Sequence, residues 1–103
     1  MKGEGCSIVV SGKFRTGYKK HFKEYSDAIR AYIEKHNGVV IRRQEILNTL
    51  YGKHSLDLFM LIEFPSQGLA EKLFFRQEYF DLIQLRDKIF SEFNMYLSPN
   101  QEI

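Results

Sequence analysis

The stretch from Leu61 to Phe90, LIEFPSQGLAEKLFFRQEYFDLIQLRDKIF, constrains the fold more than any other part of the chain. An apolar run ends at Pro65, which cannot continue a central strand, and Ser66 is a favourable helix N-cap. Beyond Ser66 the apolar residues recur at three- and four-residue steps, as in an amphipathic helix. The stretch holds no nucleophile beside a base, no metal-ligand spacing and no phosphate loop. It therefore indicates an architecture and not a reaction.

The remaining segments alternate between the two-residue period of strands and the helical period. A long apolar stripe of helical spacing starts at Tyr18 and ends at Asn37-Gly38, where we expect the glycine to take the left-handed conformation. In chain order, the sequence predicts strands over 6–13, 39–50, 56–64 and 92–97, and helices over 18–36, 66–75 and 78–90.

The predicted order is β-α-β-β-α-β, with the second helix broken near Arg76-Gln77. Two right-handed crossovers on one sheet produce an α+β ferredoxin-like fold, with a four-stranded antiparallel sheet and the helices on one face. A length of 103 residues fits a single domain over residues 1–103. Because apolar residues also fall on the other sheet face, we expect a second copy to cover it. The expected assembly is a homodimer in the form of a dimeric α/β barrel.

Composition argues against several classes of partner. The net charge is only +2 and the charges are mixed along the chain, so we expect no nucleic-acid binding. No apolar run is long enough for a membrane span, and the single Cys6 excludes an internal disulfide. With no leader pattern at the start, the expected location is cytoplasmic. Three scattered histidines without further ligands at suitable spacing predict no metal site, and no cofactor is expected.

Several residues spread over nearly the whole chain form a pattern, namely Tyr18, Tyr25, Asn37-Gly38, Gly52, Ile62 to Ser66, Ala70, Glu78-Tyr79 and Leu85-Arg86. In this pattern the sequence resembles the family named domain of unknown function 1330, within the dimeric α/β-barrel superfamily. It departs from the family pattern at Asn37, where a second glycine is usual, and at Arg76-Gln77, where Ser-Pro is usual. The resemblance implies a ferredoxin-like homodimer. Relatives in the wider superfamily include cofactor-free monooxygenases, haem-degrading enzymes and lactone isomerases, so enzymatic activity is open and rests on fold analogy alone.

Arg86 is the residue most out of pattern. On the helix predicted over 78–90 it falls on the same stripe as Tyr79 and Ile83. A guanidinium cannot lose its proton, so it needs a carboxylate, carbonyl groups, water or an anionic ligand. One interpretation makes Arg86 the anchor of a ligand. The other pairs it internally with a strand carboxylate such as Glu45 or Glu63.

Three further side chains are candidates for a small-molecule site. Tyr25 and Tyr79 lie on the inward stripes of their helices, where a hydroxyl needs a partner and can orient a ligand. His21, one helical turn before Tyr25, is a candidate general base, and Tyr25 is a candidate catalytic residue beside it. The alternative is that the tyrosines are core residues and His21 lies on the surface.

Arg42 and Arg43 are adjacent on a predicted strand, so one faces the helices and the other faces the expected partner copy. The sequence alone leaves open which is which. The function that the sequence favours is binding or conversion of a small, anionic or carbonyl-bearing molecule between sheet and helices, anchored by Arg86 with Tyr79 and Tyr25. The alternative is a non-catalytic structural or regulatory dimer module.

Overall fold

The structure is a computed structural model that describes residues 5–99. Strand formation follows the β-branched and apolar runs, and helix formation follows the stripes of helical period. The elements, in chain order, are β1 (Cys6–Phe14), α1 (Lys19–Lys35), β2 (Val39–Glu45), β3 (Leu58–Phe64), α2 (Gln67–Leu73), α3 (Gln77–Ile89) and β4 (Phe90–Pro99).

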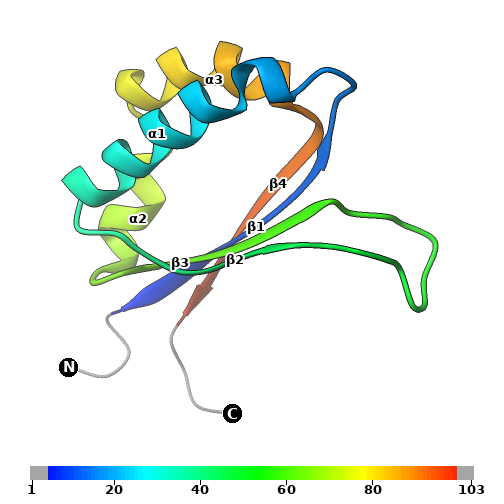
Figure 1. Cartoon of the computed structure of the whole chain (residues 1–103). Helices are drawn as coiled ribbons and strands as arrows, with labels where there is room; N and C mark the ends of the chain where they lie inside the picture. The colour runs from blue at the N-terminus through cyan, green and yellow to red at the C-terminus, as the bar shows by residue number, and fades with distance from the viewer. Residues whose placement is uncertain (1–4, 100–103) are drawn as a thin grey trace.

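Within residues 5–99, four strands form one antiparallel sheet in the order β2-β3-β1-β4. The helices lie together on one side of this sheet, with α1 and α3 side by side and α2 beneath the far end of α1 (Figure 1). This arrangement confirms the predicted α+β ferredoxin-like class. The helical layer and the sheet therefore form two layers, and the other sheet face is left uncovered.

The strand register assigns side chains to the two faces. Ile8 pairs with Ile62 and with Leu97, and the residues of this row point toward the helices. The next row, Leu61, Val9 and Tyr96, points to the uncovered side because successive strand residues alternate. The buried residues of the covered face include Cys6, Ile8, Val10, Leu58, Ile62 and Phe64.

A β-bulge in β2 decides where its two arginines point. Val40 pairs with Ile62, but the next paired residue is Arg42, opposite Leu61, so Ile41 is the extra residue. Arg42 consequently lies on the uncovered face, and Arg43, opposite Met60, lies on the helix side. The structure thus answers the question that the sequence left open.

The helix ends show which local predictions hold. Ser66 is the N-cap of α2, and its hydroxyl accepts a hydrogen bond from the Leu69 amide at 3.3 Å, as predicted. At the end of α1 the left-handed residue is Asn37, with φ of 66°, so the prediction for Gly38 was wrong. Gly38 is required for another reason, because a Cβ there would lie 2.6 Å from side-chain carbons of Ile33 and Phe64.

The strand predicted over 39–50 was wrong beyond Glu45, since its ladder with β3 ends at the pair Glu45–Leu58. We call residues 46–57 the arm: it projects beyond the helices at one end of the sheet (Figure 1). The base of the arm is closed by a hydrogen bond of 2.9 Å from Ile46 N to Asp57 O. It is tied to β1 by a hydrogen bond of 2.8 Å from Phe14 N to the Asp57 carboxylate. Leu47, Leu50 and Tyr51 of the arm are almost fully exposed.

None of the helices within residues 5–99 is both long enough and apolar enough to span a bilayer.

Candidate functional site

A small cavity lies between α1 and the covered face of the sheet. Its walls are mostly apolar and come from α1, β2, β3 and the β4 strand that follows α3. The enclosed space is about 30 Å³, which is room for one or two water molecules. A larger guest therefore needs the side chains at the mouth to move. We call this space the α1 cavity, and its lining includes Phe22, Tyr25, Ile29, Arg43, Met60 and Phe93.

Arg43 brings a positive charge to the edge of the α1 cavity. Its guanidinium carbon lies 4.8 Å from the ring centroid of Phe22, a cation–π contact between β2 and α1. Arg30 of α1 is a second guanidinium in the lining. Neither arginine forms an ion pair with any of residues 5–99. An apolar space with two cations that lack carboxylate partners is suited to a ligand with an apolar body and an anionic group.

Tyr25 is part of the lining of the same space. The side chain is buried and its ring packs edge-on against Phe90, with centroids 6.0 Å apart. Among the described residues, its hydroxyl has no hydrogen-bond partner. Burial raises the pKa of Tyr25 well above its usual range, and the nearby Tyr79 raises it further. Near neutral pH Tyr25 is thus a neutral phenol, able to donate a hydrogen bond to a guest.

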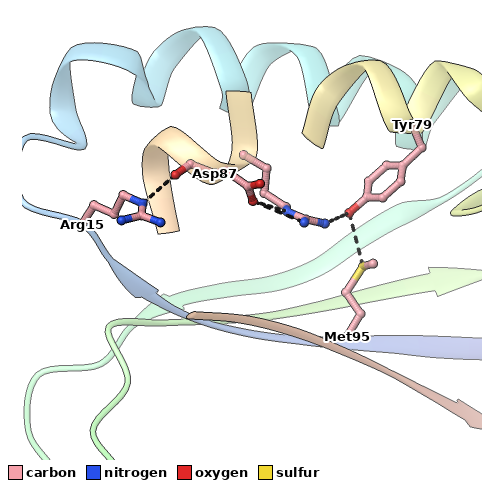
Figure 2. Close-up of polar contacts among 5 residues, drawn as sticks. Arg15, Tyr79, Asp87 and Met95 are labelled. Atoms are coloured by element: carbon pink, nitrogen blue, oxygen red, sulfur yellow. Dashed lines mark hydrogen bonds and ion pairs between the residues drawn. The ribbon is translucent and has the colours of Figure 1, made fainter. Parts of the chain in front are cut away.

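Arg86, Tyr79 and Asp87 form a polar cluster next to the cavity. Arg86 Nη1 donates to the Tyr79 hydroxyl at 3.0 Å, and its Nε and Nη2 lie 3.4 and 3.3 Å from Asp87 Oδ1. The Tyr79 hydroxyl in turn points at the sulfur of Met95 on β4, at 3.9 Å (Figure 2). The Arg86 side chain is 20% exposed and its guanidinium carbon lies 4.9 Å from the Phe93 ring centroid. The cluster therefore adjoins the α1 cavity through Phe93, which contacts Arg86 and also lines the cavity.

Arg86 is held as a structural cation in this arrangement. Burial alone would lower the pKa of Arg86, but the hydrogen bond to Tyr79 and the charge of Asp87 leave it raised. The partners of Arg86 come from its own helix, in place of the strand carboxylates Glu45 and Glu63 that the sequence suggested. Arg86 does not line the α1 cavity. A role for it as a ligand anchor stays a prediction.

The candidate residues are only partly brought together. Tyr25 lies within electrostatic reach of Tyr79 and Arg86, so the three predicted ligand-binding residues form one neighbourhood. His21 is half-buried near the start of α1 and is not among the residues that line the α1 cavity. A catalytic role for His21 and Tyr25 stays a prediction. Arg43 gained its inward position from the bulge at Ile41, a feature that no sequence signal marks.

The fold and the cavity define a class of protein: a ferredoxin-like α+β domain with an apolar space between helices and sheet. The chain belongs to the family described as domain of unknown function (DUF1330), whose model matches residues 10–99. No functionally curated protein matches the sequence.

Solved structures with the same fold are remote in sequence. A protein of unknown function from Rhodopseudomonas palustris has a TM-score of 0.81 at 12% identity, covering 99% of this chain and 86% of that one. A dimeric protein of unknown function and ferredoxin-like fold from Bacteroides fragilis has a TM-score of 0.61 at 14% identity, covering 92% and 95%. SnoaB, a cofactor-independent oxygenase from Streptomyces nogalater, has a TM-score of 0.67 at 8% identity, covering 97% and 96%. At these identities the likeness shows the fold.

Proposed function

We propose that this protein binds a small molecule with an apolar body and an anionic or carbonyl group in the α1 cavity. The observation that carries the proposal is an apolar space that is lined by Tyr25 and by Arg43, a cation without an ion-pair partner among residues 5–99. Arg43 attracts the anionic group, Tyr25 donates a hydrogen bond, and the apolar walls hold the body of the ligand.

Arg86 acts in this proposal through its neighbours. It fixes the ring of Tyr79 and stacks on Phe93, and so holds the wall between the cluster and the cavity in place. A ligand that displaces Asp87 from Arg86 would make Arg86 the anchor that the sequence analysis predicted. The two arginines therefore give competing assignments that substitution can separate.

The binding test uses 1-naphthoate as the probe and its uncharged amide as the comparison. We expect 1-naphthoate to raise the melting temperature of the wild type and to shift amide signals of residues around Tyr25 in NMR spectra. Arg43→Gln should weaken binding by roughly tenfold, the effect of losing one charge-assisted hydrogen bond. Arg42→Gln is the matched control, because it removes the same charge from the adjacent residue on the other face.

Equal loss in Arg42→Gln and Arg43→Gln would contradict the assigned site. Loss in Arg86→Gln with full binding in Arg43→Gln would move the anchor to Arg86. If no aromatic carboxylate binds the wild type, the alternative of a non-catalytic structural or regulatory module is the better account. Since a cofactor-independent oxygenase shares the fold, oxygen uptake with bound phenols is the added readout for catalysis.

We also propose that two copies pack through their uncovered sheet faces and close a barrel. Val9, Leu61 and Tyr96 form an apolar row across three strands of that face, and Tyr96 is 57% exposed. Water contact with such a row is unfavourable, and a second identical face is its simplest cover. The dimeric relative from Bacteroides fragilis has the same fold, which supports this assembly.

Light scattering on the purified chain measures the assembly directly. We expect a mass of twice 12.2 kDa for the wild type and of one chain for Val9→Glu, which places a charge in the centre of the apolar row. Circular dichroism then checks that the variant is folded. A folded wild type with the mass of one chain at high protein concentration would refute the dimer.

A further inference from the structure

We propose that a second hollow, at the C-terminal end of α1, binds an oxyanion such as a phosphate group. This basic hollow lies where the C-terminal ends of α1 and α2 meet the residue that precedes α3, and its volume is about 230 Å³. It is separate from the α1 cavity, because no described residue lines both of them. Its basic lining residues are Lys35, His36, Lys72 and Arg76.

The charge balance of the basic hollow favours an anion. None of the described residues that line it is acidic. The nearest carboxylate, Glu78, lies 2.9 Å from Lys35 and 3.7 Å from Arg76, so one negative charge is shared between two cations. The hydrogen bond from Lys35 is the main reason why the pKa of Glu78 is lowered. Lys72 has no ion-pair partner among residues 5–99, so a surplus of positive charge remains at the hollow.

His36 provides a second, independent observation. Its Nε2 is buried and is the one side-chain nitrogen or oxygen within residues 5–99 that is both buried and without a hydrogen-bond partner. The ring packs edge-on against Tyr32, with centroids 4.8 Å apart. A buried polar atom without a partner is costly. Because His36 lines the hollow, an anion oxygen bound there would give a protonated Nε2 the partner that it lacks.

Two of the three helix ends at the hollow are C-terminal ends, whose partial negative charge is offset by Lys35 and Lys72 in their last turns. Two carbonyls at the end of α1 are also already used, since Ile33 O accepts from the amides of His36 and Gly38 and Glu34 O accepts from the amide of Asn37. The start of α3 has no side-chain cap and directly follows Arg76, so the positive end of the α3 dipole lies next to the hollow. The hollow also has apolar walls, formed by Phe64 and Leu69, that suit an organic phosphate better than a fully hydrated ion.

The test titrates inorganic phosphate and phenyl phosphate into the full chain at constant ionic strength set with sodium chloride. We expect either phosphate to raise the melting temperature and to shift NMR signals of His36, Lys72 and Arg76. The double substitution Lys72→Gln and Arg76→Gln should raise the apparent Kd at least about tenfold. Lys19→Gln with Lys20→Gln is the matched control, because it removes two charges at the other end of α1.

The two probes separate the possible sources of the phosphate. Binding of both assigns the site to the phosphate group itself, and binding of phenyl phosphate alone assigns it to an organic phosphate that uses the apolar walls. The proposal is refuted if neither phosphate changes the melting temperature or the NMR signals, or if the control variant loses as much phosphate affinity as the Lys72→Gln and Arg76→Gln variant. The lysines would then only complement the helix dipoles. Arg43→Gln should keep phosphate binding, and its loss there would place the probe in the α1 cavity instead. NMR spectra of each variant verify the fold.

Discussion

The two faces of the same sheet differ in how completely their apolar side chains are packed. On the covered face Ile62 is 2% exposed and lies under the helices. Its sequence neighbour Leu61, on the other face, is only partly buried and has no layer above it within the described chain. The covered face is apolar along its length, whereas the uncovered face mixes apolar residues with polar ones such as Ser11, Glu63 and Asn94. The more apolar face is therefore the one that the helices cover, and the uncovered face retains a smaller apolar area that is available for assembly.

The largest expected difference between the faces comes from truncating each of these neighbours. Ile62→Ala should lower the free energy of unfolding by about 2 to 5 kcal/mol, because it leaves a cavity in a packed core. Leu61→Ala should cost about 1 kcal/mol at a dilution where the chain is monomeric, and more at high concentration. Urea unfolding at two protein concentrations measures both effects. Equal losses at low concentration would mean that the two faces are packed alike.

A second test concerns how tightly side chains are packed on the covered face. A Cβ on Gly12 would lie 2.6 Å from a ring carbon of Phe90, so Gly12→Ala should cost about 1 to 3 kcal/mol by overpacking. Gly68→Ala is the matched control, since only the Ser66 hydroxyl lies near, at 3.9 Å. There the gain in helix propensity should stabilise the protein by up to about 1 kcal/mol. Thermal unfolding of the pair checks the sign of each change.

A third test removes a single hydrogen bond between two helices of the helical layer. The Tyr32 hydroxyl donates to the Leu73 carbonyl at 2.7 Å and ties α1 to α2. Tyr32→Phe should lower the free energy of unfolding by about 1 to 2 kcal/mol, since it leaves a buried acceptor without a partner. On the uncovered face, Tyr96→Phe should change it by less than about 0.5 kcal/mol. A larger loss at Tyr96 would show that its hydroxyl is buried in the assembly.

The smallest effect is expected at the exposed edge of the helical layer and depends on pH. The pKa of Glu78 is held below its ordinary value of 4.5, first by the hydrogen bond from Lys35. The ionised carboxylate of Glu78 therefore stabilises the fold at pH values above 4.5. This stabilisation is lost as the pH falls through the lowered pKa of the folded state. Glu78→Gln and Lys35→Gln should each flatten this acid dependence in urea unfolding from pH 6 to pH 3. An unchanged slope in both would show that the pair contributes nothing measurable.

Local sequence signals were sufficient for the order of elements and the fold. The proline and serine at Pro65-Ser66 end one element and start the next through short-range effects, and the structure shows the predicted cap. Helical spacing also placed Tyr25 and Tyr79 on buried faces. These predictions needed only neighbours within one or two turns, so they did not depend on tertiary contacts.

The site depended on features that local patterns do not contain. The bulge at Ile41 sets which arginine faces inward, and nothing in the run Val39 to Glu45 marks a bulge. The partner of Arg86 was expected on a strand, but a long side chain on a helix can reach its own neighbour Asp87 and, two turns back, Tyr79. The helical spacing of Tyr79 and Arg86 contained that second contact. The basic hollow combines residues that precede β2 in the chain with residues at and after the end of β3. Only the folded chain brings these two groups together.

The extra residue at Ile41 has a consequence for how this strand can change in length. Val40 and Arg43 both point toward the helices although an uninterrupted strand would place residues three apart on opposite sides. A chain lacking Ile41 would keep Val40 opposite Ile62 and Arg42 opposite Leu61, now as a regular ladder. We therefore expect a deletion of Ile41 to leave the residues that face the helices unchanged. The same one-residue deletion in the neighbouring strand β3 would move the remaining side chains of that strand to the opposite face of the sheet.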